Sequence, residues 1–166
     1  MGVDVTDRRL AAIMALDVVG YSRMMSQDEV GTLHKLKTCR RNTIDPVIKL
    51  FRGRIVKSTG DGLLAEFLSA VDAITCAAAI QQQMAEDSSR APDGGSLLIR
   101  IGLNLGDLII EPDGDIFGDG VNVAARLEGL APSGGVAISR SIFEQVRDRV
   151  QFPFVEQGEF HVKNIA

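Results

Sequence analysis

Aromatic residues are scarce in this chain of 166 residues, where they make up 5% of the sequence, and Trp is absent. Val, Ile, Leu, Ala and Met must therefore fill most of the apolar interior, which the overall hydrophobic content of 45% allows. A chain of this length and composition suits one compact domain, expected over residues 1–166. No linker, internal repeat or low-complexity segment divides it.

A basic excess is also absent, since 18 Lys and Arg residues stand against 22 Asp and Glu residues. The chain thus lacks the charge pattern of a protein that binds a nucleic acid polymer or directly contacts an anionic membrane. No apolar run is long enough to span a membrane, and the N-terminus lacks the apolar core of a signal peptide. The two cysteines, Cys39 and Cys76, have no metal-ligand spacing, which favours buried free thiols. Together these features predict a cytoplasmic domain.

Apolar periodicity and turn residues predict an alternation of strands and helices. The predicted strands cover 10–19, a hairpin at 53–67, 97–105, a return strand at 107–111, 135–139 and a final hairpin at 150–163. The predicted helices cover 26–51, 70–84, 121–130 and 140–148, with a surface loop at 87–96. In the first helix, Ser26 is expected as N-cap with Glu29 completing a capping box, and Pro46 is expected to kink or divide the helix.

The first six predicted elements run strand, helix, strand, strand, helix, strand. This order indicates an α+β domain with a ferredoxin-like βαββαβ core, in which helices cover one face of an antiparallel sheet. The elements that follow extend the core by a further helix and a hairpin.

Two aspartates stand out by their position. Asp17 ends a long apolar strand, and Asp61 occupies the tip of the Gly60-Asp61-Gly62 turn. If the two strands are neighbours, both carboxylates meet at one end of the sheet and form a site for Mg²⁺ or Mn²⁺. Two plainer interpretations stay open at this point: Asp61 suits a tight turn in any protein, and Asp17 can cap the turn that follows its strand.

A second polar group lies in the helix predicted at 121–130. Asn122 and Arg126 are four residues apart and therefore share one helical face. Together they can present a neutral donor and a delocalised cation to one phosphoryl group. An ordinary solvated helix face would look the same.

The chain resembles the class III adenylyl and guanylyl cyclase family over nearly its whole length. Four matching stretches occur in the family's order and spacing: ALDVVGYS at 15–22, VKSTGDG at 56–62, IRIGLNLG at 99–106 and DIFGDGVNVAAR at 115–126. The resemblance implies a catalytic domain that uses two divalent metal ions. Asp17 and Asp61 match the family's metal-binding aspartates, and the backbone carbonyl of Val18 matches its additional ligand.

The resemblance also implies roles for other residues. Lys57 and Asp115 match the pair that selects the base, and Asn122 and Arg126 match the pair that orients the ribose and stabilises the transition state. Lys163 resembles the lysine that contacts the terminal phosphates. In the family the groups that match Lys57, Asp115, Asn122 and Arg126 meet the metals only across a head-to-tail homodimer, which gives two composite sites.

Base choice follows from hydrogen-bond donors and acceptors. Asp115 can accept from the exocyclic amine of adenine, and Lys57 can donate to its ring nitrogen, whereas guanine offers the reverse pattern. Guanylyl cyclases typically carry Glu and Cys at these two places, so the chain is expected to act on ATP. The reaction implied is in-line attack of the ribose 3′ oxygen on the α-phosphorus, which yields 3′,5′-cyclic AMP and pyrophosphate. No general base can be assigned.

The chain departs from the family pattern in three places. Asp107 stands where animal-type members have an Arg that contacts phosphate, and the short connection from Gly106 to Asp115 predicts a reduced dimerisation arm. The family continues for another strand after a segment like 163–166. The chain is therefore expected to be an excised domain that lacks a final strand, with regulatory domains elsewhere in the full protein.

Two other functions are compatible with parts of this pattern. A palm-domain nucleotidyl transferase, such as a diguanylate cyclase or a polymerase, has the same type of sheet and a two-metal mechanism. Its acidic turn motif is missing here. A non-catalytic cyclase-like module that only dimerises or senses nucleotide would be expected to lose some of the metal, base or transition-state residues. All six are present, which favours the enzyme.

Overall fold

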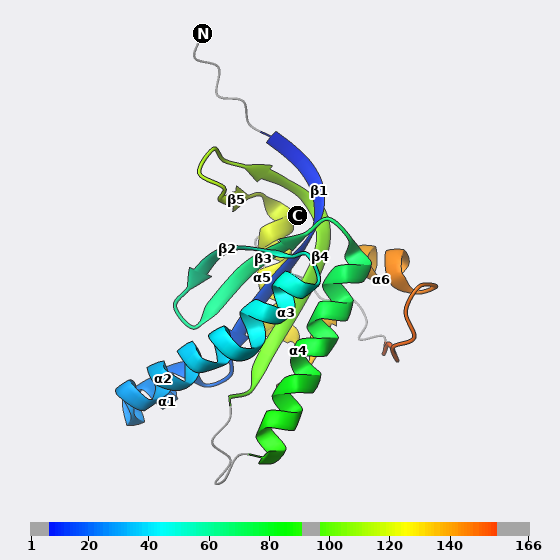
Figure 1. Cartoon of the computed structure of the whole chain (residues 1–166). Helices are drawn as coiled ribbons and strands as arrows, with labels where there is room; N and C mark the ends of the chain where they lie inside the picture. The colour runs from blue at the N-terminus through cyan, green and yellow to red at the C-terminus, as the bar shows by residue number, and fades with distance from the viewer. Residues whose placement is uncertain (1–6, 91–96, 156–166) are drawn as a thin grey trace.

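The computed structural model describes residues 7–90 and 97–155. Its centre is a sheet in which the strands β1 (Asp7–Val18), β2 (Arg54–Thr59), β3 (Gly62–Phe67), β4 (Ile99–Ile110) and β5 (Ile116–Phe117) follow the order β2-β3-β1-β4-β5 (Figure 1). All of these neighbours are antiparallel, and β6 (Val136–Ile138) pairs with β4 in parallel. The predicted ferredoxin-like core is therefore confirmed.

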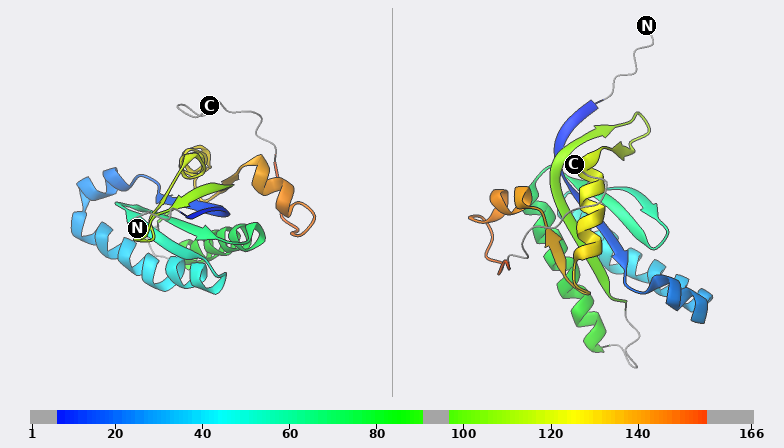
Figure 2. Two further views of the ribbon diagram at one scale, coloured as in Figure 1. Left: turned by 90° about the horizontal axis from the view of Figure 1, so that it is seen from above. Right: turned by 180° about the vertical axis from the view of Figure 1, so that it is seen from behind.

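The strand β1 is covered on both faces, which explains its unbroken apolar run. Its even-numbered residues, such as Met14, pack in the larger core with α4 (Ala70–Arg90) and the helices that precede β2. Its odd-numbered residues, such as Ile13, pack in a smaller core with Ala124 of α5 (Asp119–Leu130). Figure 2 shows α4 and α5 on opposite sides of the sheet. The prediction that helices cover one face of the sheet is therefore correct for the βαββαβ core, and α5 covers the opposite face.

The first helical region is divided more than the sequence predicts. It consists of α1 (Tyr21–Gln27), α2 (Glu29–Cys39), a π-helical turn η1 (Arg40–Ile44) and α3 (Asp45–Leu50). Ser26 lies inside α1, and the N-cap of α2 is Asp28, whose side chain accepts from the Gly31 N–H at 3.0 Å. The prediction that Ser26 begins the helix is therefore wrong. The predicted division near Pro46 is confirmed, because the π turn directly precedes it and Pro46 sits in the first turn of α3.

Two other boundaries also differ from the prediction. The chain runs straight through Gly106 as one strand, β4, and it returns only at β5, after a turn at 111–115. Gly106 serves close packing, because a Cβ there would lie 3.3 Å from the Cα of Gly120 in α5. The helix α4 continues to Arg90, so residues 87–90 are helical and not part of a loop.

The close approach of α5 to the sheet depends on Gly102 in β4. A Cβ at this position would lie 2.3 Å from the backbone nitrogen of Glu128 and 2.4 Å from the carbonyl oxygen of Ala124. No side chain fits there, so α5 packs directly against the strand backbone. The register of α5 along β4 is set by this contact.

The last described elements are β6 and α6 (Arg140–Val146), and α6 buries Ile142 and Val146 in the larger core. Residues 150–155 form no strand, and the rest of the hairpin predicted at 150–163 lies outside the described residues. Among the described residues, no helix combines the length and apolar character needed to cross a membrane.

Candidate active site

Asp17 and Asp61 lie at the same end of the sheet. Asp17 is the next-to-last residue of β1, and Asp61 lies in the turn that joins β2 to β3. Leu16 pairs with Leu63 across the two strands, and a Cβ on Gly62 would lie 3.3 Å from the Cβ of Asp17. The turn that carries Asp61 therefore packs against the end of β1.

Two further charged residues join this cluster. Arg100, which pairs with Asp17 across β1 and β4, places its Nη2 atom 3.5 Å from Asp17 Oδ1 and 3.8 Å from Glu128 Oε2. The pKa of the Glu128 carboxyl is raised to about 8, mainly by burial and also by a hydrogen bond that protonated Glu128 donates to Asp17 and by the charges of Asp17 and Asp61, whereas the charge of Arg100 opposes the rise. The cluster thus gathers two carboxyl groups around one guanidinium, and the charge of Asp61 also acts on Glu128.

The cluster fits a divalent metal ion. The Oδ1 atom of Asp17 is buried and has no hydrogen-bond partner, so Asp17 does not cap the following turn; the N-cap of α1 is Gly20. A buried carboxylate oxygen without a partner is costly unless a cation coordinates it, and Mg²⁺ and Mn²⁺ prefer such oxygens. No group of three or more Asp, Glu, His or Cys side chains in residues 7–90 and 97–155 is arranged as a metal site. A site of two carboxylates and a backbone carbonyl, the set predicted from Asp17, Asp61 and Val18, needs no such group.

Lys57 and Asp115 form an ion pair on the face of the sheet covered by α5. Lys57 Nζ lies 3.1 Å from Asp115 Oδ1, and its charge lies 5.4 Å from the centre of the Phe117 ring. A register shift between Ile55 and Lys57 lets Lys57, not Val56, pair with Leu64, and this bulge turns the lysine toward Asp115. The hydrogen bond from Lys57 lowers the pKa of the Asp115 carboxyl, and a second bond from the Ile116 N–H at 2.8 Å acts in the same direction.

Asn122 and Arg126 lie on the outer face of α5. Gly120 and Ala124 are the buried residues of this helix, and Asn122 is two positions from each, about 200° around the helix. Both Asn122 and Arg126 are exposed, and Arg126 forms no ion pair with any residue the structure describes. Within one chain they therefore point away from the sheet.

Two of the remaining predicted positions, Val18 and Asp107, lie on strands. Val18 is the last residue of β1 and its side chain is buried, so its backbone stands beside Asp17. Asp107 is exposed on β4. Lys163 lies outside the described residues.

Reasoning from the sequence missed four charged residues around these groups. They are Arg100 and Glu128 beside Asp17, Arg54, whose charge acts on Asp115, and Glu66, which pairs with Arg54. Glu66 carried a usable signal, because it is a lone charge in the apolar strand Gly62–Phe67. Arg100 and Glu128 carried none, because their contact with Asp17 depends on strand pairing and on where α5 docks.

Comparison with known proteins places the chain in a family. Residues 3–165 match the family described as the adenylate and guanylate cyclase catalytic domain. A putative adenylate cyclase 3 of Rhizobium meliloti is 51% identical over 95% of the chain, and an adenylate cyclase of Streptomyces coelicolor is 31% identical over 86%. The chain spans only 27% and 35% of the lengths of these two relatives.

Solved structures agree with this assignment. An adenylate/guanylate cyclase/hydrolase from Silicibacter pomeroyi is 45% identical, covers 97% of this chain and 93% of its own, and superposes with a TM-score of 0.91. The adenylyl cyclase CyaB from P. aeruginosa has a TM-score of 0.84 over 97% of this chain and 91% of its own, and at 21% identity it shows the shared fold alone. The chain belongs to the adenylate and guanylate cyclase catalytic-domain family.

Proposed function

We propose that this domain is an adenylate cyclase that converts ATP to 3′,5′-cyclic AMP and pyrophosphate at a site shared by two copies of the chain. The observation that carries the proposal is the buried Oδ1 atom of Asp17, which lacks a hydrogen-bond partner and stands beside the turn that holds Asp61. A buried carboxylate oxygen that has an ion pair with Arg100 but no hydrogen bond is suited to a metal cation that also binds phosphate.

Asp17, Asp61 and the carbonyl of Val18 would hold two divalent ions, Mg²⁺ or Mn²⁺. When bound, such ions supply the positive charge that lowers the pKa of the ribose 3′ hydroxyl and neutralises the triphosphate. Arg126 stabilises the negative charge that develops on the α-phosphoryl group, and Asn122 orients the ribose by hydrogen bonding. Lys163 contacts the terminal phosphates. The 3′ oxygen then displaces pyrophosphate in line.

Lys57 and Asp115 select adenine. Their contact of 3.1 Å holds a donor and an acceptor side by side, which matches the ring nitrogen and the exocyclic amine of adenine. The lowered pKa of Asp115 keeps its carboxylate ionised and therefore an acceptor. Guanine would place a carbonyl against this carboxylate and a ring N–H against the ammonium, which leaves buried polar groups unsatisfied.

The shared site follows from the direction of Asn122 and Arg126. These side chains lie on the exposed face of α5, which supports a site completed by a second copy of the chain. A head-to-tail homodimer with twofold symmetry brings the outer face of α5 in one copy to the carboxylates of the other, and it forms two equivalent sites.

The direct test is to incubate the purified domain with ATP and Mn²⁺ or Mg²⁺ and to separate the products by chromatography. Cyclic AMP and an equal amount of pyrophosphate are expected, with much less cyclic GMP from GTP. A folded dimer that binds ATP and forms no cyclic nucleotide would instead identify a nucleotide-sensing module.

A further inference from the structure

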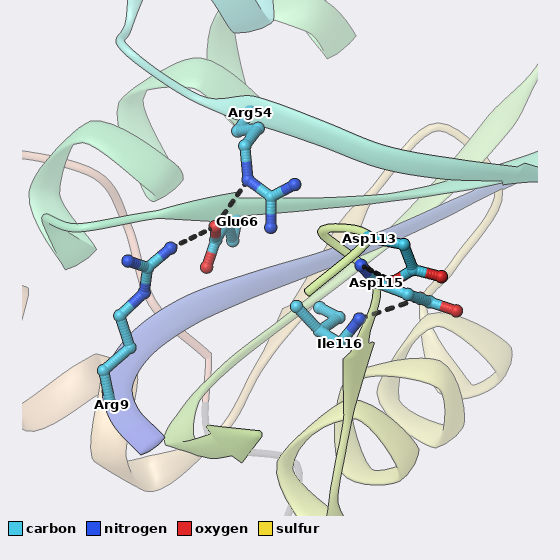
Figure 3. A network of polar contacts seen from close by, with 6 residues as sticks. All are labelled: Arg9, Arg54, Glu66, Asp113, Asp115 and Ile116. Carbon is cyan, nitrogen blue, oxygen red and sulfur yellow. Dashed lines mark hydrogen bonds and ion pairs between the residues drawn. The ribbon is translucent and has the colours of Figure 1, made fainter. Parts of the chain in front are cut away.

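Glu66 is an acidic residue near the end of an apolar strand. It lies in β3 opposite Ile13 of β1, its side chain is 4% exposed, and it therefore needs compensation for its charge. Two arginines from the flanking strands provide it. Arg9 Nη2 lies 2.5 Å and Arg54 Nε lies 2.7 Å from the same atom, Glu66 Oε1 (Figure 3).

Arg54 also reaches the turn before β5, whereas Arg9 forms no ion pair or side-chain hydrogen bond except that with Glu66 in the part of the chain that the structure describes. Its Nη1 atom lies 3.2 Å from the place that a Cβ on Gly114 would occupy, and Figure 3 shows its guanidinium between Glu66 and the turn that carries Asp113 and Asp115. The charge of Arg54 contributes to the lowered pKa of Asp115. Glu66 therefore fixes one side of a guanidinium whose other side faces the turn that carries Asp115.

The turn that carries Asp115 is held mainly by its own hydrogen bonds. Gly114 adopts the left-handed conformation with φ of 91°. Glu111 donates its N–H to the Asp115 carbonyl and accepts from the Gly114 N–H, both at 2.9 Å, while Asp113 accepts from the Asp115 N–H at 3.0 Å and Asp115 accepts from the Ile116 N–H. The strand β5 that follows has only two residues, so little sheet pairing holds Asp115 in place.

We propose that Glu66 and Arg54 are positioning residues that hold Asp115 against Lys57 and thereby set the preference for adenine over guanine. The inference rests on the proposed function, because it assigns to these residues the selectivity of that same site. Arg54 restricts the turn and offers Asp115 a second positive charge, so the carboxylate stays beside Lys57. A looser turn lets Asp115 move away, and the site then loses the acceptor that rejects the guanine carbonyl.

The structure contains a matched control for Arg54. Arg9 binds the same carboxylate oxygen and is exposed to the same degree, 43% against 42% for Arg54. Replacing either arginine by Gln removes one ion pair of Glu66 and one surface charge. Only the Arg54 change removes the cation that faces Gly114 and Asp115.

The experiment compares Arg54→Gln, Arg9→Gln, Arg54→Lys and the unchanged domain as dimers with Mn²⁺, using kcat/KM for ATP and for GTP. Arg54→Gln should lower the ratio of kcat/KM for ATP to kcat/KM for GTP by about tenfold. The fall should come mainly from a higher KM for ATP, because one charged contact is lost. Arg54→Lys should restore most of the ratio, and Arg9→Gln should leave it within about twofold. An unchanged ratio in Arg54→Gln, or an equal fall in Arg9→Gln, overturns the inference.

Hydrogen exchange of the peptide over residues 111–117 separates this inference from the proposed function. Faster exchange in Arg54→Gln than in Arg9→Gln supports the positioning role, even if the unchanged domain forms no cyclic AMP. The lack of cyclic AMP would refute the cyclase proposal and would leave the positioning role standing. Equal exchange in the two variants overturns the positioning role whatever the activity.

Discussion

The guanidinium of Arg100 lies beside the carboxylate of Asp17, with 3.5 Å between Nη2 and Oδ1, and the same nitrogen lies 3.8 Å from Glu128. The geometry leaves Asp17 Oδ1 without a hydrogen bond, and the Nε atom of Arg100 is likewise buried and unpaired. Arg100 thus lowers the electrostatic cost of gathering carboxylates at the sheet end, and it leaves their oxygens free to coordinate a cation.

Replacing Asp17 or Asp61 with Asn should lower cyclase activity at least about a hundredfold, because each change removes a ligand charge worth several kcal/mol in the transition state. Mn²⁺ should raise the melting temperature of the unchanged domain and should raise that of either variant far less. Asp107→Asn, an exposed aspartate on β4, is the control and should keep its response to Mn²⁺. Full activity in Asp61→Asn would show that the metal site is elsewhere.

The double change Lys57→Glu and Asp115→Cys should lower the use of ATP and raise the use of GTP, because it exchanges donor and acceptor on the edge of the base. The measurement is kcat/KM for each nucleotide. Loss of ATP turnover alone is a weak result, since any damage produces it. An unchanged preference for ATP would refute the assignment of this pair.

Mixing two inactive variants tests the shared site. Asp17→Ala and Arg126→Ala should each be nearly inactive alone, because each homodimer has a lesion in both sites. In a heterodimer both lesions fall in one site, so random equal mixing should return roughly a quarter of the unchanged activity. If subunit exchange is demonstrated and no activity returns, each site is built within one chain.

Two glycine changes test the packing of α5. Gly102→Ala should lower the free energy of unfolding by about 1–3 kcal/mol, because its methyl group would overlap the backbone of α5. Gly129→Ala, in the same helix with open space around it, should raise that free energy by about 0.5–1 kcal/mol. Denaturant unfolding of both variants gives the two values. A neutral Gly102→Ala would mean that α5 is not held against β4.

The two thiols should be poorly reactive at neutral pH. Burial raises the pKa of Cys39 to about 11 and that of Cys76 to about 12, so the reactive thiolate is rare below those values. Alkylation of Cys39 in the folded domain should keep accelerating with pH well above 9, and Cys76, which is fully buried, should react more slowly still. Rapid labelling of Cys76 at pH 7.5 would contradict its burial.

Local chemistry determined much of this protein from sequence alone. Residues close in sequence determine the apolar run around Asp17, the glycine turn around Asp61 and the spacing of Asn122 and Arg126. The core order of strands and helices follows from the same local patterns of apolar and turn residues. The wrong predictions concern positions where local patterns do not decide the structure. The sequence predicts a turn at Gly106, which instead packs closely against α5, and an N-cap at Ser26, whereas the N-cap of α2 is Asp28.

Only the tertiary structure decided which charges surround the site. Arg100 reaches Asp17 through strand pairing, Glu128 arrives because Gly102 lets α5 approach β4, and Arg54 reaches Gly114 across the sheet. These contacts join residues far apart in the chain, so no periodicity or spacing encodes them. A sequence states which groups are present, whereas the register of strands and the docking of a helix decide which of them share an electrostatic environment.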